Sequence, residues 1–109
     1  MTTSKTFAHD AVLTMGPEAD LRAPGAAITV ALCGHWEHEP PCPLAAHHTA
    51  AARDGELLRL RILFACEPAD EAEVRRRVGA ALAARWTVTA SGPSAVRPDE
   101  AAHVARLAG

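Results

Sequence analysis

The fold that we expect is decided by the stretch HTAAARDGELLRLRILFAC, residues 48–66. Asp54-Gly55 stands between two runs that can extend, and this dipeptide favours a tight hairpin because a type I′ turn needs positive φ at both central residues. We therefore predict a β-hairpin with arms at 47–53 and 56–66. Side chains alternate along a strand, so the second arm gives the inner face five apolar side chains: Leu58, Leu60, Ile62, Phe64 and Cys66.

The segment that follows, PADEAEVRRRVGAALA at 68–83, has the pattern of an amphipathic helix. Pro68 suits a first helical turn, and Asp70 with Glu73 has the spacing of a capping box. One stripe of the helix is apolar and would face the sheet. That stripe consists of Val74, Val78, Ala81 and Leu82.

The remaining segments complete a sheet covered by helices. Residues 26–38, AAITVALCGHWEH, alternate in the manner of a strand, and residues 85–91 do so again. Pro98 opens a short final helix. Residues 1–25 read as a loosely attached N-terminal segment, in which 6–15 could form a short strand.

This order of elements predicts an α+β fold for a single domain at 26–109. We expect a two-layer sandwich, with a mainly antiparallel sheet and two helices on one face. In broad terms the arrangement is ferredoxin-like. Only 4% of the residues are aromatic, so the core is thin, and a homodimer would complete its burial.

Charge and hydropathy exclude several classes of function. A net charge of -2 and an isoelectric point near 6.3 argue against a nucleic-acid-binding protein, which usually shows a basic surface. No apolar run approaches the roughly 20 residues of a membrane span. The N-terminal residues also lack the apolar run of a signal peptide, so we expect a cytoplasmic protein.

Residues 34–48, GHWEHEPPCPLAAHH, hold four of the six histidines. The parity of the predicted first strand places His35 on the outer face and His38 on the inner face. The Asp54-Gly55 turn would pair residue 53 with 56. His48 then lies opposite Arg61 on the outer face, and His47 lies opposite Ile62 on the inner face.

These positions predict a transition-metal site. Zinc takes nitrogen, sulfur and oxygen donors, usually four in a tetrahedron. We expect His35, Cys42 and His48 as ligands, with Glu37 as a fourth ligand or as the group that orients an imidazole. Zinc is the first choice, although copper and nickel accept the same donors. A reserve set of donors consists of His38, His47 and Cys33.

Two other functions remain open on the sequence. One is a metal-free dimeric binding or assembly module, in which the outer sheet face is the interface and its histidines form hydrogen bonds. The other is a small enzyme that uses Cys42 with the neighbouring histidines, because a nearby imidazolium lowers the pKa of a thiol. The substrate or partner cannot be deduced from these residues.

Overall fold

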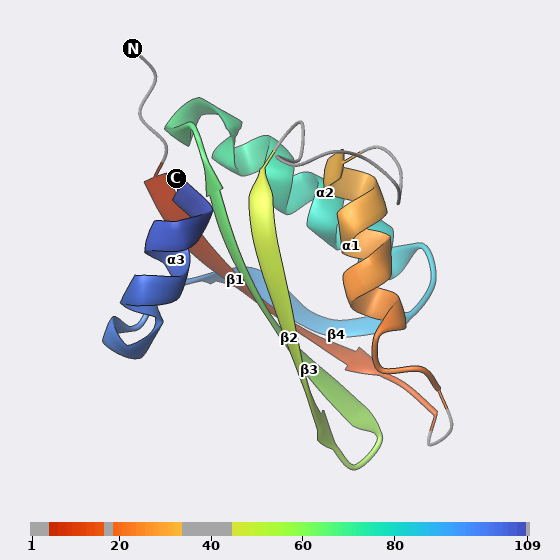
Figure 1. The fold of residues 1–109 in the computed structure, drawn as a ribbon. Helices are drawn as coiled ribbons and strands as arrows, with labels where there is room; N and C mark the ends of the chain where they lie inside the picture. Colours follow the sequence, from red (N-terminus) through yellow and green to blue (C-terminus); the bar gives the residue numbers. More distant parts are fainter. Residues whose placement is uncertain (1–4, 17–18, 34–44, 109) are drawn as a thin grey trace.

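The computed structural model describes residues 5–16, 19–33 and 45–108 of the chain. Four strands form one sheet in the order β2-β3-β1-β4, and every neighbouring pair is antiparallel. Three helices pack on this sheet (Figure 1). The elements are β1 (Lys5–Thr14), α1 (Ala23–Cys33), β2 (Ala46–Asp54), β3 (Leu57–Cys66), α2 (Glu71–Ala83), β4 (Thr87–Ser94) and α3 (Ala101–Ala108). The predicted α+β sandwich is confirmed.

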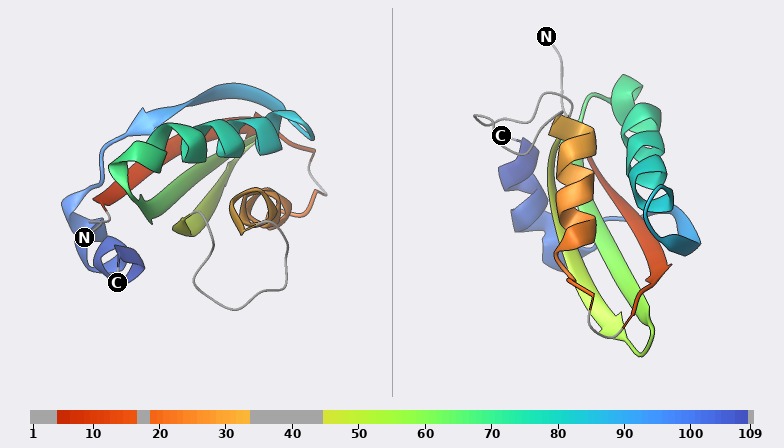
Figure 2. Two further views of the ribbon diagram at one scale, coloured as in Figure 1. Left: turned by 90° about the horizontal axis from the view of Figure 1, so that it is seen from above. Right: turned by 90° about the vertical axis from the view of Figure 1, so that its right-hand side faces the viewer.

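The two faces of the sheet are covered unequally. We call the face toward α1 and α2 the inner face and the opposite one the outer face (Figure 2). The main core lies on the inner face, where alternate residues of β1 and β3 meet both helices. Its largest fully buried side chains are Leu13, Ile28, Leu32, Leu58, Ile62, Phe64 and Leu82. On the outer face, Val104 of α3 packs with Ala8 and Leu63 in a second, smaller cluster.

The N-terminal region differs from the sequence expectation. Residues 5–14, which we expected within a loosely attached segment, form β1 between β3 and β4. Ala11 and Leu13 are buried on the inner face, and Ala8 is buried on the outer face. Because Ala8 on the outer face is apolar like its inner-face neighbours, the alternation of polar and apolar residues is weaker at this end of the strand.

The expected first strand at 26–38 is also corrected, since residues 23–33 form helix α1. Its residues are apolar almost throughout, and a short apolar run has no readable period. In the helix, Ile28 and Leu32 lie four residues apart and are buried, whereas Val30 is 44% exposed. Pro24 stands in the first turn, where it costs the helix no hydrogen bond. The two helices on one face are therefore α1 and α2, and α3 lies on the other.

The hairpin is present with its register moved by two residues. Asp54 pairs with Leu57 across a turn of Gly55 and Glu56, and Gly55 has a φ of 62°. His47 therefore lies opposite Phe64, and His48 opposite Leu63. A shift of two preserves the side-chain faces. The prediction of His47 on the inner face and His48 on the outer face is thus confirmed, while their predicted partners were wrong.

Helix α2 follows the sequence in its apolar stripe and departs from it at the N-terminus. Val74, Val78 and Leu82 are buried. Asp70 makes no side-chain capping hydrogen bond. The Glu73 carboxylate instead accepts a hydrogen bond from Arg76 Nε at 2.6 Å. The expected capping box is therefore absent, because Glu73 is drawn to the arginine one turn later.

Candidate functional site

The described residues contain no group of three or more His, Cys, Asp or Glu side chains that could hold a metal ion. This finding corrects the predicted metal-binding function. His47 and His48 are adjacent on a strand and point to opposite faces, so they cannot share an ion. Four of the expected donors lie outside the described residues: His35, Glu37, His38 and Cys42. Cys33 ends α1, and its side chain also lies outside the description.

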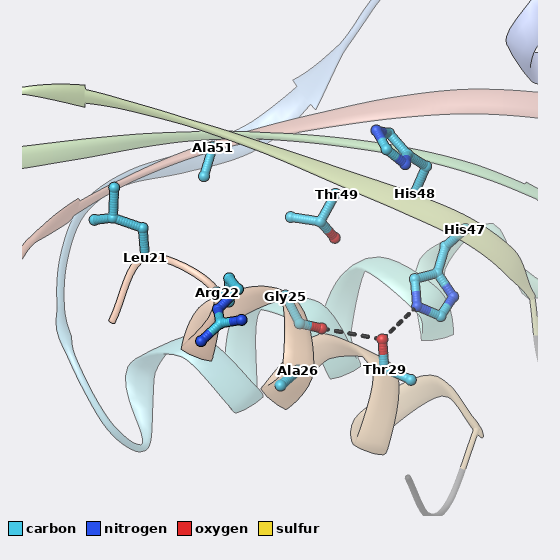
Figure 3. Close-up of a pocket in the computed structure, with 9 residues that line it drawn as sticks. All are labelled: Leu21, Arg22, Gly25, Ala26, Thr29, His47, His48, Thr49 and Ala51. Carbon is cyan, nitrogen blue, oxygen red and sulfur yellow. Dashed lines mark hydrogen bonds between the residues drawn. The ribbon is translucent and has the colours of Figure 1, made fainter. Parts of the chain in front are cut away.

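The structure instead places a groove between α1 and the edge strand β2, which we call the α1–β2 groove. It has a volume of about 530 Å³, within the range of small-molecule sites. Arg22, Gly25 and Thr29 line it from the helix side, and His47 and Thr49 line it from the strand (Figure 3). Residues 18 or more positions apart in the chain therefore face one another.

A hydrogen-bonded chain crosses the groove from helix to strand. Thr29 Oγ1 lies 3.0 Å from Gly25 O and 3.0 Å from His47 Nε2 (Figure 3). His47 Nδ1 lies 3.1 Å from Ala45 O. Because a carbonyl oxygen can only accept, Nδ1 carries a proton. The Thr29 hydroxyl donates its hydrogen to Gly25 O, and its oxygen also lies within hydrogen-bond distance of His47 Nε2.

Thr49 adds a polar atom that the fold leaves unsatisfied. Its Oγ1 is buried and has no hydrogen-bond partner among the described residues. Figure 3 shows this hydroxyl on the α1 side of the strand. A buried hydroxyl without a partner costs free energy, and such a group in a folded protein calls for an explanation.

The depth of the groove depends on Gly25. A Cβ atom built on Gly25 would lie 3.6 Å from Thr49 Cβ, an ordinary van der Waals contact. A methyl group would therefore fill this part of the groove without displacing the backbone. Glycine is otherwise unfavourable inside a helix by about 1 kcal/mol relative to alanine. Its position here keeps space open between α1 and β2.

One arginine, Arg22, lines the groove, and it is paired with Asp20. Arg22 stands at its mouth with a side chain that is 91% exposed. Its guanidinium meets Asp20 at 3.3 Å, and this exposed ion pair is weak in water. Of the described residues that line the groove, none is acidic. A negatively charged ligand would thus meet no repulsion from its walls.

The other histidine of the pair belongs to the outer face. The rings of His48 and His103 lie 4.4 Å apart between centroids. Partial burial lowers the pKa of His48, and the nearby imidazoles of His103 and His47 lower it further. The expected zinc ligand His48 therefore packs beside His103 of α3.

A second polar cluster, which the sequence did not reveal, surrounds His9. This histidine is only 4% exposed. Arg75 Nη1 lies 3.0 Å from His9 Nδ1 and donates to Ala8 O at 2.8 Å. Because a guanidinium can only donate, Nδ1 accepts, and Nε2–H donates to Ser91 Oγ at 2.9 Å. His9 therefore cannot act as the base that activates Ser91.

The His9 cluster is sealed by its neighbours. Arg75 pairs with Glu71 at 2.8 Å, and its guanidinium lies over the rings of Phe7 and Phe64. Burial lowers the pKa of His9, and the charge of Arg75 lowers it further. Each polar side chain of this cluster has a partner, so the cluster is structural. A period-two alternation of Phe7, His9, Ala11 and Leu13 was the signal that His9 faces inward.

A third cluster ties α3 to the outer face. Three arginines line a hollow of about 330 Å³ there: Arg59, Arg61 and Arg97. Each is paired, Arg59 with Asp54, Arg61 with Asp10 and Glu100, and Arg97 with Asp99 and Glu100. The hydrogen bonds from Arg61, and next from the Arg97 backbone, lower the pKa of Glu100 to about 2. Carboxylates neutralise these arginines, which makes the hollow a poor anion site.

Searches of family models, curated proteins and solved structures find no match to this chain. The candidates for a functional site are therefore the three polar clusters described above. Two of them satisfy their charges within the fold. The α1–β2 groove is the cluster that combines space, donors and a buried polar atom without a partner.

Proposed function

We propose that this chain is a small-molecule-binding domain, and that the α1–β2 groove takes a ligand with a carboxylate or phosphate group. The observation that carries the proposal is the buried Thr49 hydroxyl without a partner, at the wall of a groove. Ligand sites are typically concave, with a few polar groups that converge on one region. Thr29, His47 and Thr49 form such a set.

The charge of the ligand follows from the walls. Arg22 supplies a guanidinium, which binds carboxylates and phosphates by paired hydrogen bonds. Exchange of the exposed Asp20 contact for a ligand contact costs little, since both ions are already in water. Thr49 offers a hydroxyl donor to the same anion.

The rest of the ligand would be small and partly apolar. Leu21, Ala26 and Ala51 also line the groove, and Leu21 is 38% exposed. These side chains offer an apolar surface beside the polar set (Figure 3). We therefore expect an aromatic or short aliphatic acid to bind better than an inorganic anion.

The sequence also led to predictions about membrane spans, partners and location. No helix among the described residues is long and apolar enough to cross a membrane. The homodimer, the lack of nucleic-acid binding and the cytoplasmic location stay predictions.

The proposal is tested by calorimetry with benzoate and phenyl phosphate, using benzyl alcohol as the uncharged comparison. We expect the anions to bind the wild-type chain and the alcohol to bind more weakly. The Gly25→Ala variant should lose this binding, because its methyl group occupies the space beside Thr49.

The matched control is Gly79→Ala in α2, where a Cβ meets nothing within 4 Å. It makes the same change in a helix without touching the groove, and it should bind as the wild type does. Binding that survives in Gly25→Ala, or no binding of either anion by the wild type, would contradict the proposal.

A further inference from the structure

The two edges of the sheet differ in how they are protected. β4 carries Gly92 and Pro93, and its pairing with β1 is irregular between Val12 and Leu13. Proline and irregular pairing are common ways to block further strand addition. β2 has nine residues with no proline, glycine or lysine. Among the described strands, only β3 pairs with it (Figure 1).

The backbone of β2 presents hydrogen-bonding groups along the edge that faces away from β3. Asp54 and Leu57 flank a two-residue turn, so they form a hydrogen-bonded pair. Hydrogen-bonded and non-hydrogen-bonded pairs alternate along an antiparallel ladder. The N–H and C=O groups of Thr49, Ala51 and Arg53 therefore point away from β3, in position to receive another strand.

We infer that β2 pairs with β2 of a second copy of this chain, antiparallel and centred on Ala51. The two sheets then continue as one across a two-fold axis, where the same surface meets itself. Ala50, Ala51 and Ala52 are all exposed in the single chain. In this register Ala51 faces its own copy and Ala50 faces Ala52, so small side chains allow the strands to approach closely.

The polar side chains of β2 favour a second copy as the occupant. In the same register His48 faces Asp54 on the outer side of the pair, and two-fold symmetry repeats this contact. An imidazole opposite a carboxylate is a favourable cross-strand pair. Among the described residues, the Asp54 carboxylate pairs with Arg59 at 3.4 Å, and both side chains are exposed. A partner of unrelated sequence would match these positions only by coincidence.

The backbone of this interface is tested by sedimentation velocity of the full chain over a wide range of concentrations. We expect a reversible dimer for the wild type and a monomer for Ala51→Pro. Proline removes an N–H that points away from β3, which edge strands tolerate, so β2 and β3 stay paired. Circular dichroism checks that the variant is folded.

The charges are tested by two substitutions that leave the backbone unchanged. His48→Asp places like charges opposite each other and should weaken dimerisation by roughly tenfold, whereas His48→Lys should strengthen it. Thr87→Asp on the β4 edge is the control and should leave dimerisation unchanged. A monomeric wild type at every concentration, or a dimer that both Ala51→Pro and His48→Asp leave intact, would overturn the inference. Sedimentation is measured without ligand, so the absence of ligand binding would leave these outcomes unchanged, although Ala51 and His48 also line the α1–β2 groove.

Discussion

Two histidines on the inner face of the sheet, His9 and His47, have the same kind of neighbour and opposite surroundings. In each ring, Nε2 lies within hydrogen-bond distance of a hydroxyl oxygen. His9 Nε2 is 2.9 Å from Ser91 Oγ, and His47 Nε2 is 3.0 Å from Thr29 Oγ1. His9 is sealed within the fold, whereas His47 lines the α1–β2 groove. The residue type alone therefore does not decide whether a histidine belongs to a site.

The helices make the difference. α2 extends Arg75 over two phenyl rings and onto the backbone of β1, so that its long side chain closes the space around His9. α1 presents Gly25, Ala26 and Thr29 to β2. These side chains are too short to fill the gap. A groove thus remains where small residues face the strand, and its polar atoms are available to a ligand.

Removal of Arg75 would open the sealed cluster around His9 and should have the largest effect on stability. Arg75→Ala loses the Glu71 ion pair, the hydrogen bond to Ala8 O and the contact with His9. We expect the free energy of unfolding to fall by roughly 2–4 kcal/mol, the range for a disrupted buried network. Urea unfolding measures this change.

Arg76→Ala is the control for that measurement, since Arg76 lies on the same helix and makes an exposed pair with Glu73. It should have little effect on stability. Equal losses for Arg75→Ala and Arg76→Ala would show that the His9 cluster does not hold the fold together.

Acid should destabilise the fold through His9, by less than Arg75→Ala does. The pKa of His9 is lowered in the folded chain from an ordinary value of 6.5. Below pH 6.5 the unfolded chain binds a proton that folded His9 resists, so its contribution is complete above that pH and is lost as the pH falls. Urea unfolding of the wild type and of His9→Gln, measured across this pH range, isolates the contribution of His9 to stability.

His9→Gln cannot titrate at this position, so its stability should fall less steeply than that of the wild type. His48, whose pKa is also lowered, is present in both proteins and contributes equally to both. Parallel curves for the two proteins would refute the assignment of a buried neutral His9.

The smallest expected effect on stability concerns Gly25 in the α1–β2 groove. Gly25→Ala should raise the free energy of unfolding by about 0.5–1 kcal/mol, because alanine favours the helix and the added methyl finds ordinary contacts. Thermal unfolding of Gly25→Ala beside Gly79→Ala measures it. A destabilised Gly25→Ala protein would mean that the groove is narrower than described.

The sequence predicted local structure well where one pattern dominated. The hairpin and α2 follow from Asp54-Gly55 and from the apolar stripe at Val74 and Val78. Helix α1 was mistaken for a strand because an apolar run fits both periods. The faces of His47 and His48 were predicted correctly because parity survives a register shift of two.

The candidate site was predictable only in part. His47 and His48 stood among the expected residues, but nothing local indicates that Thr29 of α1 would meet His47 eighteen residues later. The partners of His9 lie 66 and 82 positions away in the chain. Contacts of this kind depend on strand order, which one sequence does not reveal.

The most direct test of the groove is a ¹H–¹⁵N correlation spectrum of the wild-type chain titrated with phenyl phosphate. The account predicts shifts of the amide signals of Gly25, Thr29, His47 and Thr49, which line the groove, and unchanged signals for His9 and Ser91. Shifts confined to the outer-face hollow around Arg59 and Arg97, or no shifts at all, would contradict it.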